Sequence, residues 1–408
     1  MTDRTDTATE DLPTAEEMRD YAHVGPDKPA GKLLRTFWTP VLASADLKQG
    51  RAIPLRMLGE DFTLFRGKSG KPHATQYRCA HRGTQLSAGW VEDDSIRCRY
   101  HGWKYDGKSG QCVDQPGENF ASKIKIRTYP TYEYIDLIWV YFGEGEPPEL
   151  PHYPSFEDRE LAVREVYQYK WPMNYFNAVE NDPFHPSFTH KEMNEEHFGR
   201  RGYPTITCAE TEYGSCSVTT PPPGEPNWPK TILSYFLMPY GNVSQRPLGE
   251  MRGRAMRQAI AFRVPMDDTN MHSLGLNMTF FKDKAAMTEY LAKLEEKAKQ
   301  PKPDWEDEEH VSQRILKGEL TIEDVEDRLL DFSRWFHIED YVVQVGQGAI
   351  ASRGRGEHLG PSIDANVIVL RKIYRREMSA LVEGKPLTKW RLPKELVSVP
   401  EGFGADKK

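Results

Sequence analysis

Hydrophobic and polar positions change their spacing along the chain. Between Trp38 and about Gly143, short apolar or alternating runs such as WTPVLA, DFTLFRG and IDLIWVYFG are separated by Gly, Pro, Asp and Asn about every ten residues. This spacing is typical of short strands joined by tight turns, because successive side chains of a strand point to opposite faces. The first part of the chain is therefore predicted to be an all-β module.

A segment rich in proline and glutamate follows this module. It reads GEGEPPELPHYP from Gly143 to Pro154, a composition that suits a linker rather than a helix or strand. We therefore divide the chain into an N-terminal segment (1–35), a β domain (36–150) and a larger second domain (151–408).

The second domain combines strand-like and helical patterns. Helices are predicted over Asn174–His190 and Lys284–Lys299, from Thr321 and from near His337, with a further short one over Ala15–Ala22 at the N-terminus; residues 204–282 and 366–374 are predicted to be strands. Thr321 begins the sequence Thr-Ile-Glu-Asp, which has the form of a capping box. The expected fold class is α+β.

Composition excludes several kinds of protein. Among the 408 residues, 54 Lys and Arg against 61 Asp and Glu give a net charge of −7, so no overall positive field favours nucleic acid or an anionic membrane. The longest apolar run, Ile135–Phe142, is much shorter than the roughly 20 residues of a membrane-spanning helix. The acidic N-terminus lacks the apolar stretch of a signal peptide, and five scattered cysteines do not form a disulfide framework. We expect a cytoplasmic protein.

Two short segments of the β domain each pair a cysteine with a histidine. Cys79-Ala-His81 is followed after 16 residues by Cys98-Arg-Tyr-His101, and both lie in turn-like sequences between predicted strands. Two cysteines and two histidines suit either a tetrahedral structural zinc or a Rieske 2Fe-2S cluster, in which two Cys bind one iron and two His the other.

The spacing favours the cluster. Zinc fingers pair like with like, because each short segment presents two ligands of one type. Here each segment mixes Cys with His, which suits two loops that each give one ligand to each iron. Arg82-Gly83 after the first histidine and Gly102-Trp103 after the second complete the Rieske pattern.

A second candidate metal site lies in the second domain. The segment ENDPFHPSFTH contains His185 and His190, and two imidazoles with one carboxylate form the facial triad of non-haem Fe(II) oxygenases. Five residues on an ideal helix turn through about 500°, which would leave the two side chains about 140° apart. We therefore predict a break at Pro186 that allows both histidines to bind one iron.

The carboxylate of this triad has to come from elsewhere. Asp340 is the best candidate, because spacings of four and seven place it on one helical face with Gln344 and Gln347. A plainer interpretation is that Asp340 only stabilises the first turn of a helix, a role that Glu339 would fill equally well.

The two motifs, in this order, resemble the α subunit of the Rieske non-haem iron oxygenases, also called aromatic-ring-hydroxylating oxygenases. The resemblance covers roughly residues 35 to 375. It implies an N-terminal all-β Rieske domain and a C-terminal helix-grip-like antiparallel sheet, whose helices carry the mononuclear iron. It also implies Cys79, His81, Cys98 and His101 as cluster ligands and His185, His190 and Asp340 as iron ligands.

The resemblance further implies partners and a reaction. Asp182 would bridge the iron site to a Rieske histidine of a neighbouring subunit in a head-to-tail homotrimer. The sequences HRGTQLSAGW, YHGWKYD and EHLGPSID resemble the group that contains phthalate dioxygenase and O-demethylases of lignin-derived aromatics. The expected function is that of a terminal oxygenase that uses O2 to oxidise an aromatic substrate, with O-demethylation of a methoxylated aromatic acid preferred over ring hydroxylation of a phthalate-like carboxylate.

Electrons have to come from another protein. The sequence contains no G-x-G-x-x-G stretch after a strand, so NAD(P)H would act only through a separate reductase, with or without a ferredoxin. Two other classes remain for comparison: a Rieske electron carrier, which explains only the first domain, and a zinc-dependent structural protein, which leaves His185, His190 and Asp340 without a role.

Overall fold

The computed structural model describes residues 20–181, 205–220, 232–248, 251, 253–299, 308–326, 332–350 and 357–392. The first half contains one short helix, α1 (Pro29–Leu34), and three small antiparallel sheets. Their strands are β1 (Trp38–Ala43), β2 (Ala52–Met57), β3 (Glu60–Arg66), β4 (Pro72–Gln76), β5 (Trp90–Glu92), β6 (Ser95–Arg97), β7 (Lys104–Asp106), β8 (Cys112–Asp114), β9 (Thr128–Tyr129), β10 (Thr131–Tyr134) and β11 (Leu137–Tyr141).

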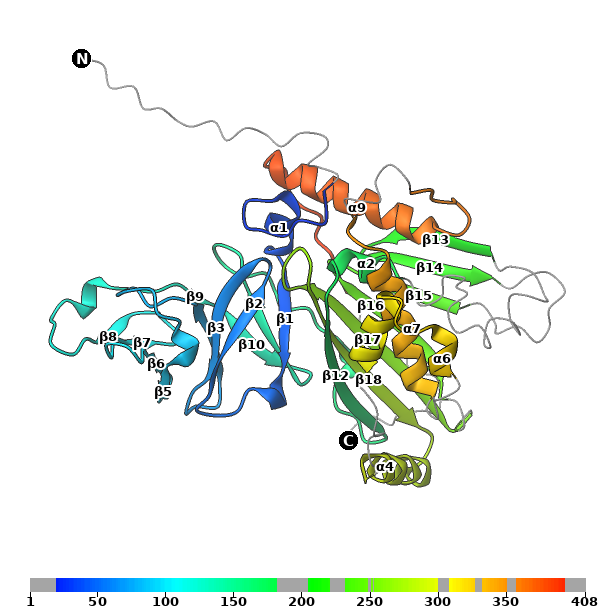
Figure 1. Ribbon diagram of the computed structural model, residues 1–408, viewed down its shortest axis with the longest axis horizontal. Coiled ribbons are helices and arrows are strands. Elements are labelled where there is room, and N and C mark those ends of the chain that lie inside the picture. The colour runs from blue at the N-terminus through cyan, green and yellow to red at the C-terminus, as the bar shows by residue number, and fades with distance from the viewer. Residues whose placement is uncertain are drawn as a thin grey trace, which may run out of the picture.

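Three sheets build this all-β half, as the alternating pattern predicted. Strands β1, β11 and β10 form one sheet, β2, β3, β4 and β9 a second, and β5 to β8 a third. Figure 1 shows the β5–β8 sheet at one end of the molecule, with β1, β2 and β3 between it and the second half. After β11 the chain forms no regular strand before Ala162.

The second half is built on one seven-stranded antiparallel sheet. Its strand order is β12-β18-β17-β16-β15-β14-β13. The strands are β12 (Ala162–Trp171), β13 (Thr205–Thr211), β14 (Gly214–Thr220), β15 (Ile232–Leu237), β16 (Gly241–Pro247), β17 (Ala255–Pro265) and β18 (Met271–Phe281). The helices are α2 (Tyr175–Val179), α4 (Lys284–Lys299), α5 (Glu308–Leu316), α6 (Ile322–Glu326), α7 (Phe332–Gly346) and α9 (Ala365–Val382). The α+β class is therefore confirmed.

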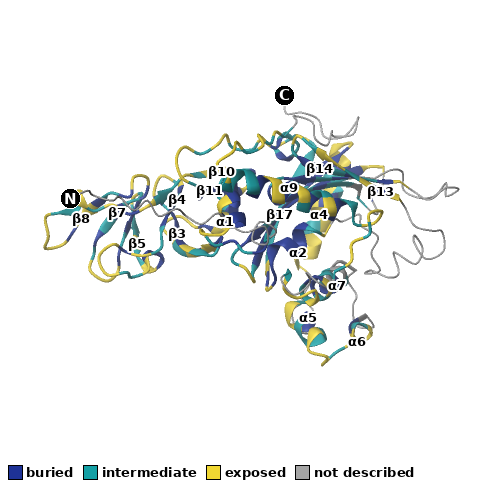
Figure 2. Ribbon diagram, turned by 90° about the horizontal axis from the view of Figure 1, so that it is seen from above, coloured by how far each residue is buried: buried dark blue, intermediate teal, exposed yellow. Residues whose placement is uncertain are grey.

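The two faces of this sheet have different neighbours. Phe262 of β17 contacts Trp139 of β11 with ring centroids 5.2 Å apart, so one face packs against the β domain. Tyr169 of β12 contacts His337 of α7 on the opposite face, with ring centroids 5.0 Å apart. Figure 1 shows α7 in front of the sheet and α9 above it, and Figure 2 shows buried residues concentrated around β17 and α2. We call the side with Tyr169 the helix face.

One predicted strand is a helix in the structure. Residues 366–374, predicted to be a strand, belong to helix α9, where Val367, Leu370 and Tyr374 are buried. Their spacing of three and four residues is helical, and it outweighs the β propensity of the valines and isoleucines around them.

Other boundaries also shift. Helix α2 ends at Val179, its N-cap is Asn174, and Glu180 and Asn181 lie outside it, while His190 lies outside the described residues. Residues 20–22 are not helical, and α7 begins at Phe332, before His337.

The capping box of α6 is confirmed, because Thr321 Oγ1 accepts a hydrogen bond from Asp324 N at 3.2 Å while Thr321 N donates to Asp324 Oδ2 at 2.8 Å. Among the described helices, none is long and apolar enough to cross a membrane.

One buried histidine makes the fold sensitive to acid. His272 of β18 is 2% exposed, and burial together with the nearby Lys170 lowers its pKa from 6.5 to about 4. The unfolded chain takes up this proton below pH 6.5, whereas the folded chain takes it up only near pH 4. We expect this group to remove about 2 kcal/mol of folding free energy between pH 7 and pH 5.

The measurement is denaturant unfolding of the wild type and His272→Gln at both pH values. The glutamine variant cannot gain this proton, so its unfolding free energy is expected to fall by about 2 kcal/mol less than that of the wild type. Equal losses in both proteins would contradict the assignment.

Candidate functional site

The first cysteine–histidine loop lies between β4 and β5. Cys79 N donates to Thr84 O at 2.8 Å, and Gly83 N donates back to Cys79 O at 2.9 Å. Gly83 has φ 75°, a left-handed conformation that costs glycine little because it has no Cβ. The loop therefore turns tightly around His81.

The second loop, between β6 and β7, repeats this hydrogen-bond pattern. Cys98 N donates to Trp103 O at 2.8 Å, and Gly102 N donates to Cys98 O at 3.0 Å, with Gly102 at φ 77°. In both loops the glycine lies four residues after the cysteine. The two predicted segments thus form matched loops, each of which holds its cysteine by backbone hydrogen bonds at the base.

The two sulfur atoms lie inside the small domain. Cys79 is 4% exposed and Cys98 is 2% exposed, and the two thiols interact with each other. Tyr105 Oη lies 3.1 Å from Cys79 Sγ. Burial raises the pKa of the Cys79 thiol, and the hydrogen bond with Tyr105 opposes that shift. Two buried thiols side by side are favourable as thiolates only if a cation neutralises them.

The two imidazoles lie together on the outside. The ring centroids of His81 and His101 are 4.6 Å apart, and His81 stacks on Trp103 at 4.6 Å with an interplanar angle of 10°. Loss of hydration lowers the pKa of His101, and the neighbouring His81 and Arg82 lower it further. This favours the neutral imidazole, which is the form that binds a metal.

The donors of these two loops therefore form two pairs, sulfurs inside and imidazoles outside, and each loop gives one member to each pair. Within the residues that the structure describes, no single point is shared by three or more His, Cys, Asp or Glu side chains. A cluster with two irons, each held by two protein ligands, fits this donor set.

Sequence reasoning missed Tyr105. Its hydroxyl reaches Cys79 from β7, and the only sequence signal is its place two residues after Trp103 on a short alternating strand. Once Cys79 is a thiolate ligand, Tyr105 can only donate this hydrogen bond, and such a donor stabilises the more negative, reduced cluster. We expect Tyr105→Phe to lower the reduction potential of the cluster by tens of millivolts, measured by redox titration of its visible absorbance. An unchanged potential would show that the hydrogen bond does not involve a ligand.

Aromatic and cationic side chains surround the exposed imidazoles. Tyr100 is 58% exposed and contacts the ring of His101, while Arg82 lies over the Tyr100 ring at 5.8 Å. Arg99 lies over the ring of Trp90 at 4.4 Å, and Trp90 is 45% exposed. We call these four residues, Arg82, Trp90, Arg99 and Tyr100, the cationic collar. Exposed aromatic and arginine side chains are typical of protein–protein interfaces.

The second candidate site is described only in part. Asp182, His185 and His190 lie outside the described residues, whereas Asp340 lies on α7 and is partly buried. Glu339, the alternative carboxylate, is 6% exposed. Gln344 is buried on the same helix, but Gln347 follows the end of α7 at Gly346, so the predicted three-residue face is shorter than expected.

Hydrogen bonds fix the end of α2 near α7 and α9. Asn177 Nδ2 donates to Gln344 O and to Gly348 O, both at 3.2 Å. Glu180, just after α2, accepts a hydrogen bond from Arg371 Nη2 of α9 at 2.9 Å. The chain that leads toward the predicted histidines therefore leaves α2 beside the helix that carries Asp340.

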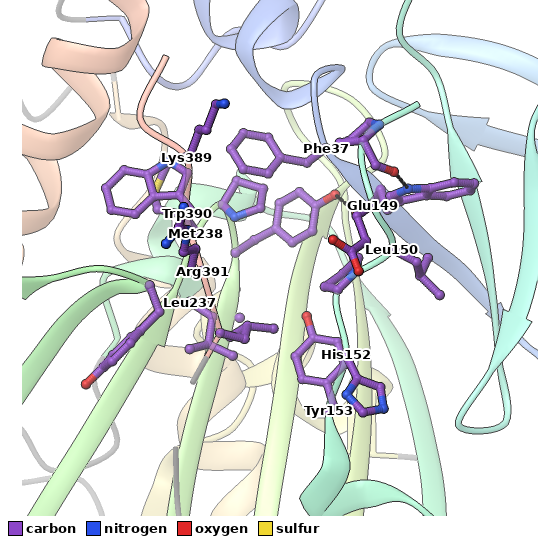
Figure 3. A pocket seen from close by; sticks show the side chains of 18 of the residues that line it. Phe37, Glu149, Leu150, His152, Tyr153, Leu237, Met238, Lys389, Trp390 and Arg391 are labelled. Atoms are coloured by element: carbon purple, nitrogen blue, oxygen red, sulfur yellow. Dashed lines mark hydrogen bonds between the residues drawn. The ribbon is translucent and has the colours of Figure 1, made fainter. Parts of the chain in front are cut away.

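A separate cavity lies on the other side of the sheet. It has a volume of about 810 Å³ and lies between the linker, the ends of β15 to β17 and residues 387–392. Figure 3 shows Tyr153, Leu237 and Trp390 among its lining side chains. Because Phe262, which lines it, points away from the helix face, the sheet separates this cavity from Asp340.

Comparison with known proteins agrees with this geometry. A family model for the Rieske 2Fe-2S domain matches residues 37–130, which include both loops. The 5,5'-dehydrodivanillate O-demethylase oxygenase subunit of Sphingobium sp. (strain NBRC 103272 / SYK-6) is 28% identical over 394 residues, which cover 91% of this chain and 82% of the relative. The chain belongs to the Rieske non-haem iron oxygenases. It is the α subunit of such an enzyme, and therefore a terminal oxygenase with a Rieske 2Fe-2S cluster.

Other relatives extend the comparison. The 3-chlorobenzoate-3,4-dioxygenase oxygenase subunit of Comamonas testosteroni is 31% identical over 269 residues, 61% of this chain and 60% of that protein. The terminal oxygenase of carbazole 1,9a-dioxygenase from Nocardioides aromaticivorans IC177 has the same fold, with a TM-score of 0.62 and 18% identity over 90% of this chain and 98% of that chain. The Rieske oxygenase fold thus extends over both halves of this protein, as the family resemblance predicted.

Proposed function

We propose that this Rieske oxygenase oxidises an aromatic substrate, and that its reaction is O-demethylation of a methoxylated aromatic acid. The observation that carries the oxygenase part is the pair of matched loops with buried sulfurs and exposed imidazoles. The O-demethylase relative, which is similar over 91% of this chain, supports the reaction. In this proposal Cys79, His81, Cys98 and His101 bind the cluster.

The proposal assigns the O2 chemistry to a mononuclear iron bound by His185, His190 and Asp340. Two hydrogen bonds from Asn177 hold α2 against the end of α7, the helix that carries Asp340, and Asn177 precedes Asp182 by five residues. When bound, the iron supplies the open coordination positions at which O2 is activated. The carboxylate of Asp340 and the imidazoles of His185 and His190 would hold this iron and leave the remaining positions free for O2.

The overall reaction balances with one O2, two electrons and two protons. One oxygen atom enters the methyl group of the aryl methyl ether, the resulting hemiacetal breaks into a phenol and formaldehyde, and the second oxygen atom leaves as water. Each catalytic cycle therefore needs two electrons from a partner protein. Because the cluster carries only one electron at a time, the partner has to deliver them in two steps.

Electron entry is proposed near the exposed edge formed by His81 and His101. The cationic collar around it suits an acidic ferredoxin or reductase, since opposite charges steer encounter. A solved complex holds the oxygenase of carbazole 1,9a-dioxygenase with its ferredoxin, and that fold is similar to this one. NAD(P)H would act only through the reductase.

Transfer to the iron is proposed to cross between subunits. In a head-to-tail homotrimer, the His81–His101 edge of one protomer would face Asp182 of the next, and such a heterologous contact closes into a ring. A cytoplasmic location, without nucleic acid or membrane as partner, remains part of the proposal.

A second candidate reaction is ring hydroxylation of an aromatic carboxylate. The relative from Comamonas testosteroni, a 3-chlorobenzoate dioxygenase subunit, favours it. In that reaction both oxygen atoms enter the ring. A pure electron carrier would explain the cluster but not the seven-stranded sheet with Asp340.

The test supplies the purified protein with a reductase, a ferredoxin and O2 and follows a panel of aromatic acids with and without methoxy groups. Formaldehyde in a one-to-one ratio with consumed methoxy substrate is expected. A dihydrodiol without formaldehyde would establish the second candidate. Reduction of the cluster with no oxidation of any compound in the panel would reject both reactions.

A further inference from the structure

The cavity behind the seven-stranded sheet has walls from both halves of the molecule. Trp139 of β11 and Phe262 of β17 line it together with Trp390, which belongs to the segment that follows α9. Its volume of about 810 Å³ lies within the range of roughly 300 to 1,000 Å³ that is usual for small-molecule sites. Aromatic side chains and prolines make up most of the lining, which suits a flat apolar molecule.

Most polar groups on these aromatic walls are already paired within the protein. Trp38 Nε1 donates to Pro148 O at 2.7 Å, and Tyr240 Oη donates to Thr39 Oγ1 at 2.7 Å. Each of these side chains therefore presents only an apolar surface to the cavity.

Tyr153 is the exception. Its side chain is 9% exposed, and its ring is fixed against Trp139 at 5.9 Å and Phe262 at 5.7 Å. Figure 3 shows its hydroxyl oxygen directed into the cavity, where it forms no hydrogen bond with any residue that the structure describes. Leaving a deeply buried hydroxyl without a partner is costly, which points to a ligand that supplies one.

This hydroxyl keeps its proton. Burial raises the pKa of Tyr153, and the neighbouring Tyr240 and Tyr134 raise it further. A neutral phenol can both donate and accept a hydrogen bond. Tyr153 therefore suits a hydroxyl group on a bound molecule, which has the same two capacities.

Charged side chains line the open edge of the cavity. Figure 3 shows Glu149 of the linker on one side and Lys389 and Arg391 on the other. All three are exposed, and none of them forms an ion pair within the described residues. His152, also at this edge, is paired with Glu157 at 2.7 Å. Two cations against one carboxylate favour an anionic group on the ligand.

We propose that this cavity is a second ligand site, which binds a two-ring aromatic acid with a hydroxyl group at the end opposite its carboxylate. The rings would lie among the aromatic walls, the hydroxyl would hydrogen-bond with Tyr153 Oη, and the carboxylate would lie between Lys389 and Arg391. The sheet separates this cavity from Asp340, so its ligand would not occupy the proposed iron site.

The test uses three biphenyl probes with the intact protein and its iron centres. One carries a hydroxyl at one end and a carboxylate at the other, the second lacks the hydroxyl, and the third has an amide in place of the carboxylate. Calorimetry measures their binding. The wild type is expected to bind the hydroxy acid more tightly than either of the other two probes.

Tyr153→Phe removes only the unpaired hydroxyl. It is expected to weaken binding of the hydroxy acid by about 3- to 10-fold, as the loss of one neutral hydrogen bond implies, and to leave binding of the acid without a hydroxyl unchanged. Tyr240→Phe is the matched control, because Tyr240 lines the same cavity but its hydroxyl is paired with Thr39. That variant should keep the preference for the hydroxy acid.

Two further variants test the charged edge and the location. Replacing Lys389 and Arg391 together with glutamine should reduce the preference for acid over amide by about 2- to 10-fold, whereas Lys385→Gln, which removes a cation paired with Glu383, should not. Leu387→Trp adds bulk to a half-buried position of the lining and should weaken all three probes by at least about 10-fold. Visible absorbance of the cluster shows whether each variant keeps its fold.

The proposal has clear contrary outcomes. No binding of any probe to the wild type would overturn it, and so would a Tyr153→Phe protein that binds the hydroxy acid as tightly as the wild type or loses both acids equally. An unchanged preference for acid over amide in the double glutamine variant would show that the carboxylate does not lie at this edge. None of these measurements uses turnover, so the site stands or falls independently of the proposed reaction.

Discussion

Replacing Cys98 with alanine is expected to remove the red-brown colour of the purified protein and all of its O2-dependent turnover. Cys98 is 2% exposed, next to Cys79, and held by hydrogen bonds from both ends of its loop. No water or side chain can replace a buried thiolate at that position, so one iron would lose half of its protein ligands. Absorbance, acid-labile sulfide and iron content measure the loss.

Cys112 provides the matched control. It is also 2% exposed, belongs to the same hydrophobic cluster, and lies outside both loops, where its Sγ contacts Asp114 O at 3.5 Å. Cys112→Ala should keep the colour and most of the turnover at a modest cost in stability. A Cys98→Ala protein that stays coloured, or a Cys112→Ala protein that loses its cluster while remaining folded, would reject the ligand assignment.

Replacing Asp340 with alanine is expected to separate the two metal sites. The wild type should hold about three irons per chain, two in the cluster and one bound by the triad. Asp340→Ala should hold about two, with an unchanged cluster spectrum, because the cluster loops lie in the other half of the molecule. Turnover should fall by more than about 100-fold, beyond the effect expected for loss of an outer-shell partner.

Glu339→Gln tests the alternative carboxylate. Glu339 is adjacent to Asp340 and more deeply buried, so its exchange for the neutral amide perturbs the same turn of α7 without removing the proposed ligand. This variant should retain the third iron. Loss of that iron in Glu339→Gln, and its retention in Asp340→Ala, would reverse the assignment of the two residues.

Much of the cluster loop structure was predictable because it is local. Each loop is defined by a cysteine, a histidine two or three residues later and a glycine in the left-handed region. These positions are close neighbours in the sequence, so their spacing already dictates two tight loops. The strand pattern of the β domain was predictable for the same reason, since alternation with period two depends only on near neighbours.

Predictions failed where local preference and packing disagree. Residues 366–374 contain valine and isoleucine at a density that suggests a strand, yet they lie in α9, where Ile373 and Tyr374 are fully buried. Burial of one helical stripe against the sheet outweighs the weak propensity of single residues.

The sequence by itself determined the chemical types available: two Cys–His loops, two histidines five residues apart and a candidate carboxylate on a helix. The tertiary structure decided which of these groups meet. Tyr105 reaches Cys79 across 26 positions, and Asn177 joins α2 to α7 across 167. Contacts of this kind depend on how strands and helices pack over long separations, and no local pattern of residues encodes them.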